Sequence, residues 1–217
     1  MIELIPSLLV QSEKEFEHKL RLVEPHVKTV HVDILDGSLF DRTSWHDVEK
    51  IGDIETPVRY EIHLMVENPL PYVEAWKKHV KNTFRAIIQS ELDRPVGLIL
   101  EEIRQTFGLE TGLTLNPESP IKDITQHLPN LDEILVMGIH PGASGQPFLG
   151  QPILEEIKRI KANTALPISC DGGVTLENAE TIVRAGCNRL VTASAIFAAV
   201  DPQGTLLAFQ KRLSEIR

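Results

Sequence analysis

The chain has 217 residues, 42% of them hydrophobic, so it is long enough for one large α/β domain or two small ones with a sizeable core. Its formal net charge of −9 at pH 7 argues against a nucleic-acid-binding surface, because neutralising phosphates requires clustered Lys and Arg. Only 5% of the residues are aromatic, which also disfavours a surface that stacks bases.

Short apolar segments alternate along the chain with longer charged segments whose apolar residues recur at a helical period. The apolar segments predict eight β-strands, at residues 2–6, 28–34, 58–64, 84–89, 111–115, 133–139, 166–171 and 189–193. Seven amphipathic segments predict helices, the first from Ser12 and the others near residues 70–80, 94–107, 118–128, 150–163, 175–186 and 202–216. Ser12 and Glu15 have the spacing of a capping box. The segment 38–52 is irregular and is predicted to contain only a short helix.

The alternation of strands and helices indicates a parallel sheet. Eight strand–helix units of about 27 residues each can close into a (β/α)8 TIM barrel of the α/β class, at the compact end of its usual length range. No linker or low-complexity segment divides the sequence, so residues 1–217 are predicted to form a single (β/α)8 barrel domain. An open, doubly wound sheet is the alternative, and the lack of Gly-x-Gly-x-x-Gly after the first strand disfavours it.

Four residues of metal-ligand type lie toward the C-terminal ends of predicted strands: His31, Asp33, His63 and Asp171. Side chains two residues apart on a strand point the same way, so His31 and Asp33 share a face. Catalytic groups of (β/α)8 barrels lie at this end of the strands. Two imidazoles and two carboxylates can close around one divalent cation, and the carboxylates can also move protons. A His-x-Asp pair alone is more often structural, but buried carboxylates are costly unless they are paired or bind metal.

Three loops at the same end of the predicted barrel can hold a phosphate group. They are the loop after strand six (141–146), the glycine pair after strand seven (171–173) and the segment after strand eight (192–194). Glycines let backbone N–H groups approach an anion closely, and a helix N-terminus adds a favourable dipole. Any one of these loops can be only a turn, but three adjacent loops favour a phosphate site. Met65 and Met137 lie near the barrel mouth and, taken singly, are predicted to fill the core.

The sequence also bears on where the protein works. Its start lacks the basic and apolar regions of a signal peptide, and no apolar run approaches the ~18 residues that a membrane span needs. Two cysteines, Cys170 and Cys187, are too few for the disulfide framework of a secreted fold. We therefore expect a cytoplasmic protein with reduced, packed cysteines that binds neither nucleic acid nor a membrane.

The chain resembles the ribulose-phosphate 3-epimerase family over nearly its whole length. The matching segments, in order, are Pro6-Ser-Leu8, His31-Val-Asp-Ile-Leu-Asp-Gly37, His63-Leu-Met-Val66, Leu115-Asn-Pro117, Val136-Met137, Pro141-Gly142, Gly145-Gln-Pro-Phe148, Asp171-Gly-Gly173 and Ser194-Ala-Ile-Phe197. The family is a (β/α)8 barrel that binds one divalent metal and interconverts D-ribulose 5-phosphate and D-xylulose 5-phosphate by inverting carbon 3.

The resemblance implies a role for each matching position. The metal ligands would be His31, Asp33, His63 and Asp171, with Asp33 and Asp171 as the two acid/base groups of a proton transfer through an enediolate. The substrate-binding residues would be Ser7, His63, Met65, Met137, Gly142, Ala143, Ser144, Gly145, Gly172, Gly173, Ala193 and Ser194. The ligand set suits zinc, iron(II), manganese or cobalt. The expected partner is a small-molecule sugar phosphate, and a homo-oligomer is implied because barrels of this family are often dimers or hexamers.

The sequence departs from the family pattern at several positions around the expected substrate pocket. Leu35 stands where the family has Met, Arg42 about where it has Asn, Gln89 where it has His, His140 where it has Asn, and Ala193 where it has Gly. None of these changes removes a metal ligand or an acid/base carboxylate. An epimerase for another ketose phosphate, such as D-allulose 6-phosphate, and a non-catalytic sugar-phosphate-binding descendant are therefore the alternatives. A decarboxylase would need a Lys near Asp33, and the sequence offers none there.

Overall fold

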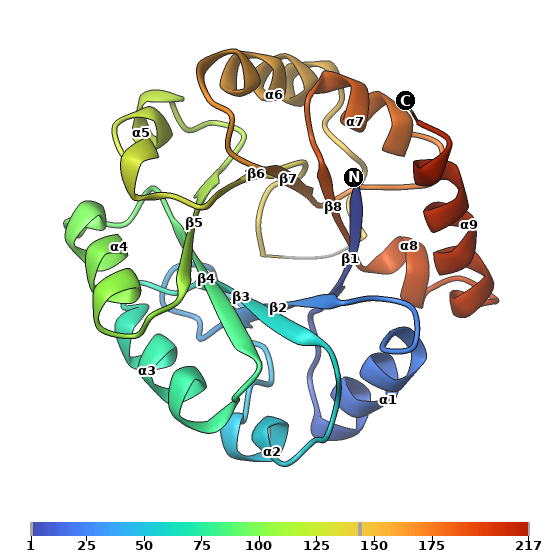
Figure 1. Cartoon of the computed structure of the whole chain (residues 1–217), viewed down its shortest axis with the longest axis horizontal. Helices are drawn as coiled ribbons and strands as arrows, with labels where there is room; N and C mark the ends of the chain where they lie inside the picture. Colours follow the sequence, from blue (N-terminus) through green and yellow to red (C-terminus); the bar gives the residue numbers. More distant parts are fainter. Residues whose placement is uncertain (1, 143–144, 217) are drawn as a thin grey trace.

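The computed structural model describes residues 2–142 and 145–216. Eight parallel strands form one closed barrel, in which each strand pairs with the next and β8 pairs with β1 (Figure 1). The strands are β1 (Glu3–Leu8), β2 (Thr29–Leu35), β3 (Arg59–Met65), β4 (Thr83–Gln89), β5 (Glu110–Leu115), β6 (Glu133–Met137), β7 (Ile168–Asp171) and β8 (Arg189–Thr192). The predicted TIM barrel is thus confirmed, and most strand ends agree with prediction within one or two residues.

Helices surround the ring of strands (Figure 1). They are α1 (Glu13–Val23), α2 (Val48–Gly52), α3 (Leu70–His79), α4 (Val96–Gln105), α5 (Lys122–Thr125), the 3-10 helix η1 (Leu128–Asn130), α6 (Gln151–Asn163), α7 (Ala179–Ala185), α8 (Ser194–Phe197) and α9 (Pro202–Ser214). No helix among the described residues is long and apolar enough to cross a membrane.

The helix predicted over 118–128 is largely wrong. The chain there forms only the four-residue α5, followed by η1. Pro129 lies within η1, where proline cannot continue an α-helical hydrogen-bond ladder. The helix predicted from 175 likewise begins only at Ala179, because the Asn178 side chain accepts from Thr175 N and donates to Gly173 O, which holds the preceding residues in a turn.

The capping box of α1 forms with one difference from the predicted pattern. Ser12 Oγ accepts from Glu15 N at 3.3 Å, as expected. The Glu15 carboxylate accepts instead from Gln11 N at 2.9 Å, one residue before the cap. Either way, one more backbone donor at the start of α1 is satisfied.

Strand alternation divides the core in two and determines what faces the barrel interior. On β2, Val30, Val32 and Ile34 belong to the main apolar core under the helices, so the residues between them, His31 and Asp33, point inward. A second, smaller apolar cluster consists of Ile5, Ile87, Leu135, Met137, Ile139 and Val191. Polar side chains also lie inside the barrel. Those toward the C-terminal ends of the strands contain the predicted site.

Candidate functional site

The four predicted metal ligands come together inside the barrel. One ligand atom of each of His31, Asp33, His63 and Asp171 lies within 4.8 Å of the others, and all four residues are buried. Asp171 is the last residue of β7, but β2 and β3 each continue two residues beyond Asp33 and His63. The ligands thus lie toward the C-terminal ends of their strands, and β2 and β3 extend one residue further than expected.

The two ring nitrogens of His31 differ, because only one of them has a hydrogen-bond partner among the described residues. Its Nδ1 donates to Glu61 Oε1 at 2.9 Å. Its Nε2 is buried without a hydrogen-bond partner among the described residues and lies 3.5 Å from Asp33 Oδ1. A buried imidazole nitrogen left free beside a carboxylate, with the opposite nitrogen held by another carboxylate, is the arrangement of a metal-ligating histidine.

His63 faces the Asp33 and Asp171 carboxylates with its Nδ1 atom, whereas His31 faces Asp33 with Nε2. Nδ1 lies 3.0 Å from Asp33 Oδ1 and 3.9 Å from Asp171 Oδ2. Its Nε2 lies 2.7 Å from Gln89 Nε2 and 3.2 Å from Thr114 Oγ1. The two rings are tilted by 59° with centroids 5.3 Å apart. Two imidazole nitrogens and two carboxylates thus surround one position, and this buried cluster could hold a metal ion.

The two carboxyl groups of the cluster have opposite pKa shifts. Burial raises the pKa of Asp33, but the nearby imidazoles of His31 and His63 outweigh it and bring the pKa far below its ordinary value. Burial and the nearby negative charge of Asp33 raise the pKa of Asp171 to about 7. At neutral pH one carboxyl group is therefore a base, while the other can carry a proton.

A cleft opens above the cluster, with about 500 Å³ of space not filled by protein atoms, part of it open to solvent. Its lining consists of Ser7, Leu9, Asp33, Met65, Met137, Ile139, Gly142, Gly145, Asp171, Gly172, Gly173, Val174, Thr192, Ala193 and Ser194. Nine of the twelve residues predicted to bind substrate therefore line this cleft. His63 is fully buried and is not part of this lining, and Ala143 and Ser144 lie outside the described residues.

The backbone conformation after β7 favours glycine at two successive positions. Gly172 and Gly173 have φ angles of +95° and +68°, which other residues rarely adopt. A Cβ at Gly172 would also lie 2.3 Å from Ile139 Cγ1, and one at Gly173 would lie 2.5 Å from Phe148 N. These contacts bring the loops after β6 and β7 close together beside Asp171.

Comparison with known proteins identifies the family. The family model described as the ribulose-phosphate 3 epimerase family matches residues 3–197. The chain belongs to this family. It is 30% identical to the ribulose-phosphate 3-epimerase of Bacillus subtilis, over 100% of this chain and 99% of that one, and 28% identical to that of Mycobacterium leprae, over 86% and 84%.

Members of the ribulose-phosphate 3-epimerase family are isomerases, and so is this chain. Among solved structures, 3-hexulose-6-phosphate synthase from Salmonella typhimurium matches with a TM-score of 0.76 and 14% identity, covering 100% of both chains. At that identity the likeness shows the shared barrel alone.

Three departures from the family pattern occupy different places in the structure. Gln89 is fully buried and contacts His63, so it touches a candidate ligand directly. Arg42 is exposed in the loop after β2. His140 is exposed after β6, with its Nδ1 3.9 Å from Glu118 Oε1. Only Gln89 among these three therefore alters the immediate surroundings of the cluster.

Glu61 and Thr114 also contact the candidate ligands, although they were not predicted as site residues. Glu61 precedes His63 by two residues on β3, so strand alternation alone places both side chains inside the barrel. A carboxylate two residues before a candidate ligand is thus a signal that could have been found. The contact of Thr114 with His63 depends on the alignment of β3, β4 and β5, which the sequence does not display.

Ser7 provides a test of how Asp33 is positioned. Its hydroxyl donates to Asp33 Oδ2 at 2.5 Å, from the neighbouring strand β1. Because a hydrogen bond to a charged group contributes about 1.5–3 kcal/mol, Ser7→Ala should lower kcat/KM about 10- to 100-fold. Ser169→Ala, which removes another buried hydroxyl inside the barrel, should leave kcat/KM close to that of the wild type. An unchanged kcat/KM in Ser7→Ala would contradict this role.

Proposed function

We propose that this chain is a metal-dependent sugar-phosphate epimerase that inverts carbon 3 of a ketose phosphate, with D-ribulose 5-phosphate and D-xylulose 5-phosphate as its substrate pair. The observation that carries the proposal is the pair of buried carboxyl groups, Asp33 and Asp171, which line one cleft with opposite pKa shifts. The name of the relatives supplies ribulose phosphate, and inversion of its carbon 3 gives xylulose phosphate. We further propose a cytoplasmic homo-oligomer that acts in the pentose phosphate pathway of carbohydrate metabolism.

The proposed cofactor is one divalent cation, held by His31, Asp33, His63 and Asp171. Two observations indicate that these residues fit a cation. The Nε2 atom of His31 has no hydrogen-bond partner among the described residues, and the donor set consists of two imidazoles and two carboxylates. That set suits zinc, iron(II), manganese or cobalt. When bound, the cation supplies a Lewis acid for negative charge on the substrate oxygens.

The proton transfers are assigned to the two carboxyl groups. Inversion needs one group on each face of the planar intermediate that forms when the carbon 3 proton leaves. Asp33, held ionised by its partners, is suited to accept a proton, and Asp171, with its raised pKa, is suited to deliver one. In the reverse reaction the two roles exchange.

The substrate phosphate is proposed to bind the backbone amides of the three loops beside the cleft. Gly142 and Gly145 follow β6, Gly172 and Gly173 follow β7, and Ala193 and Ser194 follow β8. Phosphate sites after strands seven and eight are frequent in barrel enzymes. Met65 and Met137 line the same cleft with uncharged, polarisable sulfur.

The test is a solvent-exchange assay with the metal-loaded protein in D₂O. D-ribulose 5-phosphate should be converted to D-xylulose 5-phosphate, with deuterium entering at carbon 3. The same assay with D-allulose 6-phosphate tests the substrate assignment, since activity only on the six-carbon ketose would keep the chemistry and change the substrate. Absence of both exchange and inversion with both sugars would overturn the proposed function.

A further inference from the structure

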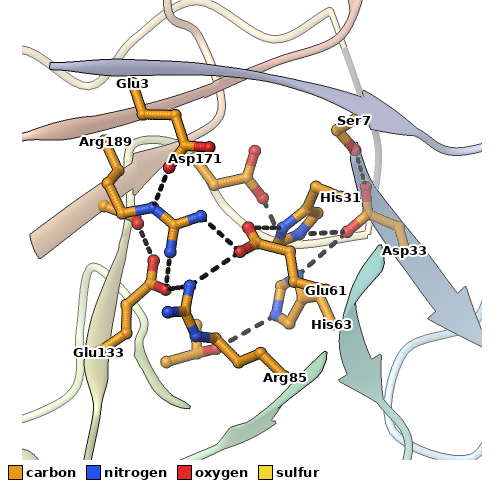
Figure 2. Close-up of polar contacts among 12 residues, drawn as sticks. Glu3, Ser7, His31, Asp33, Glu61, His63, Arg85, Glu133, Asp171 and Arg189 are labelled. Carbon is orange, nitrogen blue, oxygen red and sulfur yellow. Dashed lines mark hydrogen bonds and ion pairs between the residues drawn. The ribbon is translucent and has the colours of Figure 1, made fainter. Parts of the chain in front are cut away.

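Below the ligand cluster, toward the N-terminal ends of the strands, the barrel contains a set of charged side chains that the proposed proton transfers do not use. We call Glu61, Arg85, Glu133 and Arg189 the ionic layer. They come from β3, β4, β6 and β8, and all four are buried. Figure 2 shows the two arginines placed between the two glutamates.

Within the ionic layer, each arginine contacts both glutamates. Glu61 Oε2 accepts from Arg85 Nη1 at 3.0 Å and from Arg189 Nη2 at 2.6 Å. Both arginines also donate through Nη1 to Glu133 Oε2, and Ser169 donates to Glu133 Oε1. Buried ion pairs are weak evidence for stability, because well-packed apolar residues in the same place are often as stable or more so. Stability alone therefore does not explain why these four charged residues occupy the barrel interior.

The two oxygens of Glu61 have different partners. Oε2 accepts from the two arginines, while Oε1 accepts from His31 Nδ1 at 2.9 Å. Glu61 and His31 are also register partners on β3 and β2. The two arginines thus fix one oxygen of the Glu61 carboxylate, and its other oxygen holds the His31 ring. The Nε2 atom of that ring is left on the side of Asp33 (Figure 2).

We propose that Glu61, anchored by Arg85 and Arg189, is a positioning residue that keeps His31 with Nδ1 as donor and Nε2 available to a divalent cation. This inference rests on the proposed metal site. A carboxylate on the far nitrogen fixes the tautomer and the orientation of a ligating histidine and raises its basicity, and its loss typically costs 10–100-fold in metal affinity. His63 differs, because its far nitrogen meets the uncharged Gln89 and Thr114.

The test compares Glu61→Gln with Glu133→Gln in the full chain. Both glutamates are fully buried and contact both arginines, but only Glu61 bonds to His31. Glu133→Gln therefore makes the same chemical change within the ionic layer without removing a hydrogen bond to His31. Metal-free protein is titrated calorimetrically with zinc, manganese and cobalt. Glu61→Gln should raise the metal dissociation constant about 10–100-fold, and Glu133→Gln should leave it within about threefold of wild type.

The possible outcomes separate the two proposals. A wild type that binds none of the cations would overturn the proposed metal site, and the positioning role with it. A wild type that binds, with Glu61→Gln equally tight or with both variants equally weakened, would overturn the positioning role alone. If Glu61→Gln does not fold, ¹⁵N NMR of the wild-type imidazoles decides. His31 Nδ1 should carry a proton before and after cation binding, and a neutral ring protonated only at Nε2 would overturn the inference.

Discussion

Asp171→Asn should abolish inversion at carbon 3 while some exchange of the carbon 3 proton with solvent survives. Asp171 lies on β7 and Asp33 on β2, with β8 and β1 between them in the barrel, and both line the cleft. Without the Asp171 carboxyl group one face of the intermediate has no acid/base group, so a proton removed by Asp33 can return only to the same face. General acid–base catalysis contributes about 10²–10⁴-fold, which sets the expected loss in turnover.

Asp33→Asn should show the complementary behaviour, with exchange surviving through Asp171. Each variant also removes a candidate ligand, so the metal content must be measured alongside turnover by elemental analysis. A loss greater than 10⁴-fold together with an empty site would report on the metal rather than on the proton transfer. Asp53→Asn, at the exposed end of α2, makes the same chemical change outside the cleft and should retain wild-type activity. Full inversion in either cleft variant would refute the two-carboxylate mechanism.

The barrel could be predicted from the sequence because its strands are short, apolar and regularly spaced. The inward placement of His31 and Asp33 followed from alternation on a single strand. The glycine loops after β6 and β7 were recognisable because Gly142, Gly145, Gly172 and Gly173 adopt positive φ angles that favour glycine. These features depend on local sequence, which a single chain displays.

The ionic layer could not be predicted in the same way. Arg189 is 128 residues from Glu61 in sequence, and their contact depends on barrel closure and strand register. An isolated charged residue in an apolar strand, such as Arg85, gives no indication of its partner. The short α5 has a local cause that the amphipathic pattern of 118–128 does not display, because Pro129 in the following η1 cannot continue an α-helix. Tertiary pairing and proline chemistry thus account for most of what the sequence did not predict.

Removing divalent cations with a chelator should lower turnover at least about 100-fold and lower the melting temperature. The activity loss follows from the Lewis acid, which contributes several kcal/mol. The stability loss follows from linkage, because a cation at 100 times its dissociation constant stabilises the folded state by about 2.7 kcal/mol. For a chain of this length that corresponds to about 5–10 °C. Stoichiometric re-addition of one divalent metal should restore both quantities.

A pair of histidine variants makes this test specific to the cluster. His31→Gln removes the imidazole whose Nε2 has no hydrogen-bond partner among the described residues, so chelation should change its melting temperature by no more than about 1 °C. His18→Gln, on the exposed face of α1, should respond to chelation like the wild type. Wild-type turnover that persists after chelation, with residual metal far below one ion per chain, would contradict metal dependence. A chelator-sensitive melting temperature in His31→Gln would instead place the cation away from this cluster.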